Sequence, residues 1–533
     1  MKDYLRELIK NALTKFGIEK ELGDISIEIP NNKEHGDYSS NVALKEANKI
    51  NMNARDFAMK LSTEIIDDNI TKIEVAGPGF INFYLKNDYL FNNLNTIITD
   101  NEYGKSNVGN GTKINIEYVS ANPTGVLHLG HARGAAYGDA LARIMKFTGF
   151  DVTREYYIND GGNQINNLVA SIKARYDELK GLDVEFPQDG YHGQEIIELT
   201  KKLLVDYPDA ITEEVIRECG MNYLLNNIKN DLKNFNVEFD VWFSEKTLYE
   251  SKSVENVLNH LIQNNFTYEQ DGAIWLKTSE YGDEKDHVLV KNDGNYTYLL
   301  PDIAYHMNKF SRNYESLIDV LGADHHGYVP RLKASLQMMG YDSSKIDVEI
   351  LQMVRLLKAG EEIKMSKRTG KVVTMNELVD EVGLDATRYI FTSRSLDTQL
   401  DFDIDVATKH NNENPVYYIQ YAYARISSIL AEYNKEIQPM NYQYLTSEYT
   451  LNLLNKMYEF KDVVEAAALR HMPHLLTNYV YDLANLFHIF YAHEHVLTDN
   501  EIKTKEYINL IKAVSIIIKQ SLNLIGVQAY EKM

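Results

Sequence analysis

The stretch INIEYVSANPTGVLHLGHARG, Ile114–Gly134, joins a strand-like segment to a loop and then to the start of a helix. Its first six residues, Ile114–Val119, alternate as a strand does. The next four-residue signal, Asn122–Gly125, combines Asn, Pro, Thr and Gly, which favours a turn. The stretch therefore predicts a strand whose carboxyl end opens into a loop that feeds a helix.

The residues that follow extend this pattern into a larger unit. Small and apolar side chains predict a helix from Leu129 to Phe147, and Gly149 is a helix stop. The segment DVTREYYI, Asp151–Ile158, has the character of a second strand. Strand, helix and strand in this order indicate a βαβ unit, so we expect a parallel sheet with helices on its faces.

Open parallel sheets bind ligands beyond the carboxyl ends of their strands. Besides the loop above, two other segments are expected there. GADHH, Gly322–His326, follows a predicted strand at Leu317–Leu321, and KMSKRTGK, Lys364–Lys371, follows a predicted strand at Asp347–Leu357 and a turn. These three segments are the candidate site.

Two histidines, His128 and His131, stand three residues apart at the predicted helix start. A helix N-terminus favours an anion, Gly130 and Gly134 permit close approach, and two imidazoles can donate hydrogen bonds to phosphate oxygens. A metal site would need further ligands, and the HExxH pattern is absent. An ordinary helix start with two satisfied histidines remains the alternative.

The lysine-rich segment places Lys364 and Lys367 on either side of Met-Ser, with Arg368 and Lys371 close behind. A mobile cationic loop of this kind can close on a polyphosphate, although a solvated surface loop is the simpler interpretation. The spacing of a Walker P-loop is absent.

The composition limits the class of protein. The chain has 533 residues, enough for about three domains, and its one cysteine, Cys219, excludes internal disulfides and cysteine-rich zinc sites. No apolar run is long enough to span a membrane. The net charge of −22 argues against a uniformly basic nucleic-acid surface, but residues 411–533 hold ten Lys and Arg against thirteen Asp and Glu, which leaves room for a local basic face.

HLGH followed much later by KMSKR resembles the paired HIGH and KMSKS motifs of class I aminoacyl-tRNA synthetases. Together with REYYINDGGNQ, TYLLPDIAYH and GADHHGYVPRLKA, the opening stretch is similar to the bacterial type of arginyl-tRNA synthetase, over nearly the whole chain. Two departures are mild: Leu129 stands for an isoleucine, apolar for apolar, and Arg368 stands for the final serine and adds positive charge to a phosphate loop.

The resemblance implies an α/β fold with three parts. Residues 1–105 would form an added N-terminal α+β domain that binds the tRNA elbow and D-loop, and 411–533 an all-α anticodon-binding domain. Between them, 106–410 would form the Rossmann-like parallel-sheet catalytic domain of the class, with a mostly helical insertion at about 165–290.

The resemblance also implies an arginine pocket. A guanidinium prefers carboxylates in fork geometry. We therefore expect Glu117, Tyr298 and Asp302 at the guanidinium end, and Asn122 and His325 at the α-amino and carboxylate end. The implied set around arginine is Glu117, Asn122, His128, Tyr298, Asp302 and His325.

For catalysis, the resemblance implies that the arginine carboxylate attacks the α-phosphorus of ATP and that a ribose hydroxyl of tRNA then takes the arginyl group. His128 and His131 would serve the α-phosphate, and Lys364 and Lys367 the outer phosphates. Mg²⁺ would arrive with ATP, and no metal held by the protein alone is expected. The further ATP-binding residues would be Gly130, Gly322, Asp324, His326, Met353, Val354 and Ser366.

The expected partners are tRNA(Arg), L-arginine and ATP, without a membrane, for a cytoplasmic monomer. Phe80 and Asn82 would contact an unstacked tRNA loop base. Two other interpretations compete. One is a metal-dependent phosphoesterase built on the Asp-His-His string, for which Asp160 and Asp302 are the added candidates; the other is a tRNA-binding protein that has lost catalysis.

Overall fold

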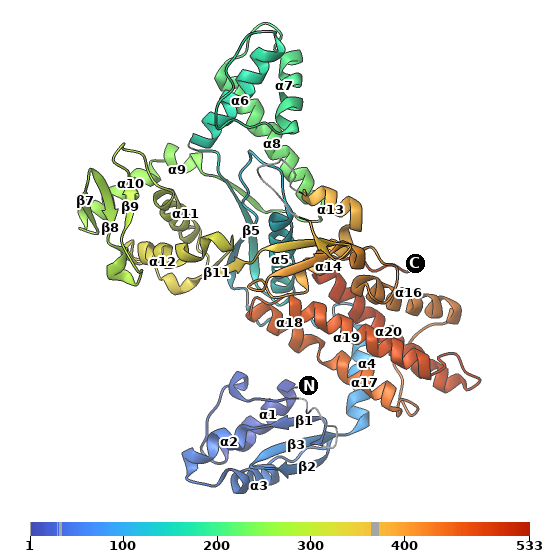
Figure 1. Cartoon of the computed structure of the whole chain (residues 1–533). Coiled ribbons are helices and arrows are strands. Elements are labelled where there is room, and N and C mark those ends of the chain that lie inside the picture. Colours follow the sequence, from blue (N-terminus) through green and yellow to red (C-terminus); the bar gives the residue numbers. More distant parts are fainter. Residues whose placement is uncertain (1, 29, 31–34, 162, 364–372) are drawn as a thin grey trace. The chain divides into compact units, whose positions relative to one another are not determined.

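The computed structural model of the chain describes residues 2–28, 30, 35–161, 163–363 and 373–533 (Figure 1). Contacts divide these residues into two compact units. Unit 1 comprises residues 1–103, 425–460 and 485–517, and unit 2 comprises 104–424, 461–484 and 518–533. None of the helices in the described part of the chain combines the length and apolar character that crossing a bilayer requires.

The N-terminal part of unit 1 is a three-stranded antiparallel sheet covered by helices. The strand order is β1-β3-β2, with β1 Tyr38–Ser40, β2 Ile70–Ala76 and β3 Phe80–Leu85. The helices of this part are α1 Lys2–Thr14, α2 Val42–Glu46 and α3 Ala54–Glu64. Leu5, Ile9 and Leu13 recur every four residues on α1, so one face of that helix enters the core beside Phe57 and Phe83.

Gly36 is required by this packing. It has a φ of +90°, and a Cβ atom there would lie 2.7 Å from the carbonyl oxygen of Phe83. Only glycine adopts this conformation without strain and lets the HGDY segment approach β3 so closely. The neighbouring Asp37 then accepts a hydrogen bond from the backbone N–H of Leu85 at 2.8 Å.

The last third of the chain is helical and contributes to both units. Its long helices are α16 Pro415–Tyr433, α17 Glu448–Tyr458, α18 Phe460–Leu469, α19 His474–His493 and α20 Glu501–Leu524. Helix α17 belongs to unit 1, and α18 belongs to unit 2 from residue 461 onward. Helix α4, Asn87–Thr99, is tied to the segment before α17: Asn95 donates to the Met440 carbonyl at 3.0 Å and accepts from the Tyr442 hydroxyl at 2.6 Å.

Unit 2 is built on a five-stranded sheet in which every pair is parallel, in the order β11-β10-β4-β5-β6. The strands are β4 Lys113–Glu117, β5 Asp151–Ile158, β6 Val241–Ser244, β10 Ser316–Gly322 and β11 Ile346–Leu351. Four consecutive residues of β4 are buried, as expected of a central strand covered on both faces. The predicted parallel sheet is thus present.

Helix α5, Leu129–Phe147, connects β4 to β5 and has the predicted bounds. Its small residues let it lie close to the sheet: a Cβ atom on Gly138 would come within 2.3 Å of the Tyr118 ring. Gly149 follows the helix with a φ of +89°, which explains why the helix stops there.

The prediction of one strand over Asp347–Leu357 was wrong. The chain leaves the main sheet after Leu351, and β12, Val354–Lys358, begins a second sheet of order β13-β12-β14 with β13 Glu361–Glu362 and β14 Leu400–Asp403. The two apolar runs are nearly continuous in sequence, so periodicity could not reveal the break. A hydrogen bond from Arg133 to the carbonyl of Gln352, described below, holds the chain at this break.

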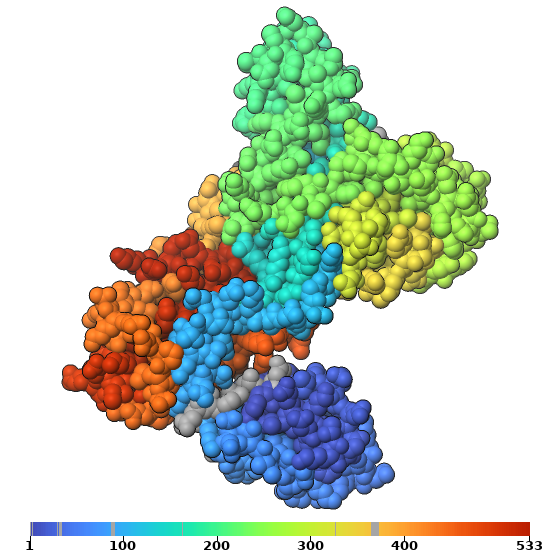
Figure 2. Space-filling model, turned by 180° about the vertical axis from the view of Figure 1, so that it is seen from behind, coloured from blue at the N-terminus to red at the C-terminus, as the bar shows by residue number. Residues whose placement is uncertain are grey.

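The insertion predicted at about 165–290 contains helices in both halves, and its second half also contains short strands that were not predicted. Helices α6 Asn163–Leu179, α7 Gln194–Asp206 and α8 Glu213–Asn234 form a lobe that projects from the sheet (Figures 1 and 2). Strand β6 then joins the central sheet, and β7 Thr267–Gln270, β8 Ala273–Leu276 and β9 His287–Val290 form a small antiparallel sheet. These strands have four residues each, which is too short for a periodic signal.

The other helices of unit 2 complete the packing around the sheets. They are α9 Lys246–Glu250, α10 Ser253–Gln263, α11 Leu299–Ser311, α12 Val329–Met338, α13 Met375–Val382, α14 Leu384–Thr392 and α15 Ile404–Ala407. Helices α10, α11 and α12 share one apolar core with the ends of β8 and β9. Helix α11 bears the candidate arginine-binding residue Asp302.

Candidate active site

The order of the central sheet reverses between β4 and β10. From β4 the chain continues outward to β5 and β6, and it later returns to add β10 and β11 on the other side. Crevices at such reversal points are the usual ligand sites of open parallel sheets. Here Glu117 ends β4, Asp319 is its register partner on β10, and Gly322 ends β10.

The two predicted histidines begin α5 and cap it. Nδ1 of His128 accepts from the N–H of Gly130 at 3.1 Å, and Nδ1 of His131 accepts from the N–H of His128 at 3.2 Å. The rings stack with centroids 3.8 Å apart. Because an accepting nitrogen carries no proton, each neutral ring has its proton on Nε2 and can donate from there. This arrangement suits an anion at the helix N-terminus.

The lysine-rich segment itself, with Lys364, Ser366 and Lys367, lies outside the described residues. The residues after it are described, and they meet the histidines. Thr374 forms a β-bridge with His128, and the N–H of Met375 donates to the carbonyl of Leu127 at 2.8 Å. The chain therefore returns from the lysine-rich segment directly to the start of α5.

Arg133, one turn into α5, explains the position of the second sheet. Its buried guanidinium donates to the carbonyl oxygens of Gln352 at 2.8 Å, Ser395 at 2.8 Å and Thr398 at 2.9 Å. These carbonyls precede β12 and β14, which pair in the second sheet, and β12 leads the chain toward the lysine-rich segment. Beside them Met353 is exposed and Val354 is buried, so of the two residues predicted to contact adenine only Met353 offers its side chain.

Asp302 lies in the first turn of α11, four residues after Tyr298. Its Oδ2 accepts from the Tyr328 hydroxyl, and no described residue donates to Oδ1. Burial raises the pKa of Asp302 to about 6, with Glu117 and Asp319 adding to the effect. Tyr298 is 69% exposed at the helix start. Asp302 is thus a carboxylate with an available oxygen in a poorly hydrated place.

Glu117 is more fully engaged than the sequence suggested. Its Oε1 accepts from the Ser120 hydroxyl at 2.9 Å, and its Oε2 accepts from Lys309 Nζ at 2.6 Å. The backbone just beyond it is strained, with φ values of +69° at Val119 and +36° at Ser120. The strain brings the Ser120 hydroxyl back onto the carboxylate.

The other predicted ligand-binding residues line the loops around this centre. Asn122 is exposed, and His325 is half-exposed, with its Nε2 3.7 Å from Asp324 Oδ2. A Cβ atom on Gly322 would lie 2.7 Å from Asp324 Oδ1, so a side chain there would displace the exposed Asp324 carboxylate. The side chain of His326 is outside the described part. None of these positions tests a binding role, and the roles remain predictions.

One carboxylate near Asp302 was missed. Glu245, at the start of α9, is 5% exposed, accepts from the Tyr249 hydroxyl at 3.3 Å, and has its pKa raised by burial, with Asp302 contributing. Its sequence context, FSEKTLYE, looks like an ordinary polar helix start. A single buried acid on a short helix leaves no pattern that sequence alone could detect.

The residues predicted to contact tRNA differ in exposure. Phe80, at the start of β3, is 37% exposed, whereas Asn82 is 3% exposed and accepts from the Ser39 hydroxyl at 2.7 Å. Of the two, Phe80 is the one open to a partner in this structure.

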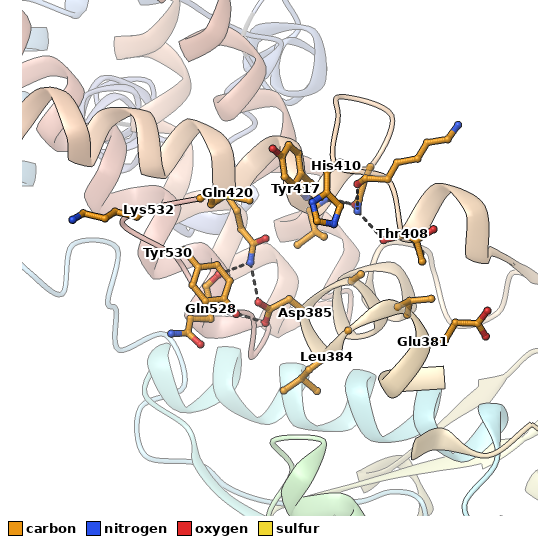
Figure 3. A pocket seen from close by; sticks show the side chains of 18 residues that line it. Glu381, Leu384, Asp385, Thr408, His410, Tyr417, Gln420, Gln528, Tyr530 and Lys532 are labelled. Atoms are coloured by element: carbon orange, nitrogen blue, oxygen red, sulfur yellow. Dashed lines mark hydrogen bonds between the residues drawn. The ribbon is translucent and has the colours of Figure 1, made fainter. Parts of the chain in front are cut away.

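Unit 2 also contains a pocket of about 590 Å³ whose lining includes neither His128 nor His131 (Figure 3). Its centre is Asp385, which accepts from Gln420 Nε2 at 2.9 Å and from the N–H of Gln528 at 3.0 Å. Tyr417, whose ring lies 5.5 Å from that of His410, and Lys532 also line it. The pocket thus combines an aromatic ring with a cation.

The residues that hold the reversal point, the capping histidines and the second sheet match a family model described as the catalytic domain of class I (R) tRNA synthetases, over residues 93–403. The fold and the site therefore define a class I aminoacyl-tRNA synthetase. Two further models match: the arginyl-tRNA synthetase N-terminal domain at 3–85 and the DALR anticodon binding domain at 419–533. The chain belongs to the arginyl-tRNA synthetase family.

Relatives agree with this assignment. The chain is 49% identical to the arginine–tRNA ligase of Geobacillus kaustophilus and 47% identical to that of Bacillus subtilis, covering 100% of this chain and 99% of each relative. The fold resembles the Thermus thermophilus arginyl-tRNA synthetase with a TM-score of 0.79 at 21% identity, covering 100% of both chains. The predicted fold class and enzyme class are confirmed, and the phosphoesterase interpretation is excluded.

Proposed function

We propose that the chain charges tRNA(Arg) with arginine at the carboxyl edge of β4 and β10. Arginine and ATP give arginyl-adenylate and pyrophosphate, and the 3′ end of tRNA then takes the arginyl group with release of AMP. The observation that carries this placement is the bridge between His128 and Thr374, because it joins the anion-binding helix start to the end of the lysine-rich segment.

ATP lies with its α-phosphate at His128 and His131 and its outer phosphates at Lys364 and Lys367. The Nε2–H groups donate to oxygens that gain charge during attack, so their hydrogen bonds strengthen in the transition state. Ser366, Gly130, Gly322, Asp324 and His326 complete the nucleotide site, with adenine against Met353 and Val354. Mg²⁺ enters with ATP and neutralises the outer phosphates.

Arginine lies with its guanidinium at Asp302, whose Oδ1 is available, and with Tyr298 beside it. Glu117 borders the same end, and Glu245 adds a further buried carboxylate. Asn122 and His325 hold the α-amino and carboxylate groups near His128. In this pose the substrate carboxylate faces the α-phosphate, and positioning supplies most of the catalysis.

The tRNA is held outside this centre. We assign its elbow to residues 1–105, where Phe80 can stack on a loop base beside Asn82, and its anticodon to the helical residues 411–533. The pocket of Figure 3 offers a tyrosine ring and a lysine to the same partner. The division into domains at 105 and 410, the cytoplasmic location and the monomeric state belong to this proposal.

The test is aminoacylation of total tRNA with each amino acid in turn. Charging by arginine alone is expected, and charging by any other amino acid would overturn the assignment. ATP–pyrophosphate exchange, measured with and without tRNA, addresses the coupling between the parts. We expect exchange only when tRNA(Arg) is bound, because tRNA held by both outer parts would order the centre.

A further inference from the structure

Lys309 is fully buried next to the residues proposed to bind arginine, and its side chain does not reach the exposed surface of that pocket. Lys309 Nζ is 2.6 Å from Glu117 Oε2 and 2.7 Å from Asp319 Oδ1, and its side chain has no exposed area. Glu117 and Asp319 are register partners on neighbouring strands at the point where the sheet order reverses. One ammonium therefore ties the carboxyl end of β4 to the middle of the neighbouring strand β10, where the sheet order reverses.

Asp319 has a second cationic partner. Its Oδ2 lies 2.7 Å from His306 Nε2, and His306 Nδ1 lies 2.8 Å from the carbonyl oxygen of Asp302. A carbonyl only accepts, so Nδ1 carries a proton, and Nε2 needs one to meet a carboxylate. Burial lowers the pKa of His306, but the pairing with Asp319 outweighs it and the net pKa is raised. The ring is an imidazolium.

These groups form one stripe on α11. Asp302, His306 and Lys309 are four and three residues apart, which places them on the same face of the helix. Asp302, with its available oxygen, lies at the N-terminal end of this helix face. Lys309, toward the C-terminal end, pairs with Glu117 on β4 and Asp319 on β10. Any shift of α11 would therefore move Asp302 relative to Glu117.

The charges of this group leave one unit uncompensated. Glu117, Asp302 and Asp319 carry three negative charges, and His306 and Lys309 carry two positive charges. A buried charge without a partner is costly. A guanidinium beside Asp302 supplies the missing positive charge, whereas a neutral side chain of the same shape does not.

We propose that Lys309 is a positioning residue that determines specificity for arginine. It holds Glu117 and compensates its charge, so that Asp302, with Glu245 nearby, demands a cation from the substrate. Lys309 does not contact the substrate. The proposal rests on the placement of arginine at Asp302 and Glu117 described above.

The first experiment compares Lys309→Met with Arg312→Met. Arg312 directly follows α11 and pairs with the buried Glu155 at 2.7 and 2.8 Å. Glu155 is the neighbour of Glu117 on β5, but Arg312 itself is bonded to neither Glu117 nor Asp319. Both variants remove a cation that pairs with a buried carboxylate near the C-terminal end of α11, so Arg312→Met controls for the loss of such an ion pair. We expect Lys309→Met to lower kcat/KM for arginine about 10²-fold through KM, as misplaced binding groups do. The KM for ATP should not change, and Arg312→Met should leave the arginine KM unchanged.

A double-mutant cycle with Glu117→Gln completes the test. If Lys309 acts through Glu117, the variant Lys309→Met/Glu117→Gln should match Glu117→Gln alone in kcat/KM for arginine. The double variant removes both members of the pair, so it carries the test even when Lys309→Met does not fold.

Two results would overturn the proposal. One is a double variant that is about tenfold or more below Glu117→Gln, which would mean independent roles. The other is an arginine KM in Lys309→Met no different from that of Arg312→Met. If instead Glu117→Gln leaves the arginine KM unchanged, the placement of the pocket itself is wrong, and the role of Lys309 falls with it.

Discussion

On the proposed arginine side of the site, the recognition groups are carboxylates held by other side chains, of which Lys309 is fully buried. Glu117 is bound by Lys309 and Ser120, and Asp302 is bound by Tyr328. On the phosphate side, His128 and His131 are held by backbone N–H groups. In this proposal the arginine side is preformed by side-chain contacts, whereas the phosphate side is the start of α5, which the chain meets at Thr374.

The difference follows from the two ligands. A guanidinium has one charge and a fixed shape, so a preformed counter-charge in a poorly hydrated place gives selectivity. A triphosphate gains and redistributes charge during the reaction, so groups that strengthen their contact in the transition state are more useful than tight ground-state binding. Substitutions on the two sides should therefore change different kinetic constants.

The largest effect is expected at Asp302. Asp302→Asn keeps the size and removes the charge, and it should lower kcat/KM for arginine by about 2–5 kcal/mol. It should also narrow the gap between arginine and citrulline, because the amide no longer demands a cation. Measuring kcat/KM for both substrates in both proteins decides this. An unchanged ratio would make Glu117 the guanidinium partner and reverse the roles given to the two acids.

The next effect is expected on the phosphate side. Lys367→Ala should lower kcat about 10²–10³-fold, the range seen when one transition-state donor is lost. The KM for arginine should stay close to that of the unaltered protein. A loss confined to the arginine KM would show that the lysine-rich segment serves the amino acid, and the contrast between the two sides would disappear.

The phosphate side was also the side that the sequence predicted best. Helix α5 was predicted with its observed bounds, because small residues, capping histidines and Gly149 are all local signals. The break between β11 and β12 was missed, since it depends on Arg133 reaching Gln352 from 219 positions away. Signals carried by neighbouring residues can be recognised in the sequence, whereas a contact between residues so far apart cannot.

On the arginine side, the sequence predicted only residues that would contact the substrate, and not the buried groups that support them. Asp302 and Glu117 were proposed from the family resemblance, but Glu245, His306, Lys309 and Asp319 were not noticed in the sequence. Their importance arises from burial and from pairing between β4, β10 and α11. The four-and-three spacing of Asp302, His306 and Lys309 was visible in the sequence, but the same spacing occurs on many solvent-exposed helices.

A smaller effect should appear with pH on the arginine side. Because burial raises the pKa of Asp302 to about 6, this carboxyl takes up a proton as the pH falls through 6 and loses its attraction for the guanidinium. We expect kcat/KM for arginine to fall about tenfold per pH unit below that pKa, since kcat/KM reports groups of the free enzyme. Asp302→Asn should abolish this limb. A limb that persists in the variant belongs to another group.

The smallest effect is expected for the helix cap at Thr374, on the phosphate side of the site. Thr374 caps α13 by accepting from the N–H of Glu377 at 3.1 Å, while its own N–H donates to Glu377 Oε2 at 2.8 Å. Thr374→Ala removes the hydroxyl cap, a loss of about 1 kcal/mol, and loosens the residues that bridge to His128. We expect kcat to fall about fivefold with the arginine KM unchanged, because only the phosphate side is displaced.

Thr212→Ala is the matched control: Thr212 caps α8 by accepting from the N–H of Val215 at 3.4 Å, so it loses the same kind of cap in the projecting lobe. Equal losses of kcat in the two variants would mean that capping stabilises the fold in general, and that the bridge to His128 does not position the lysine-rich segment.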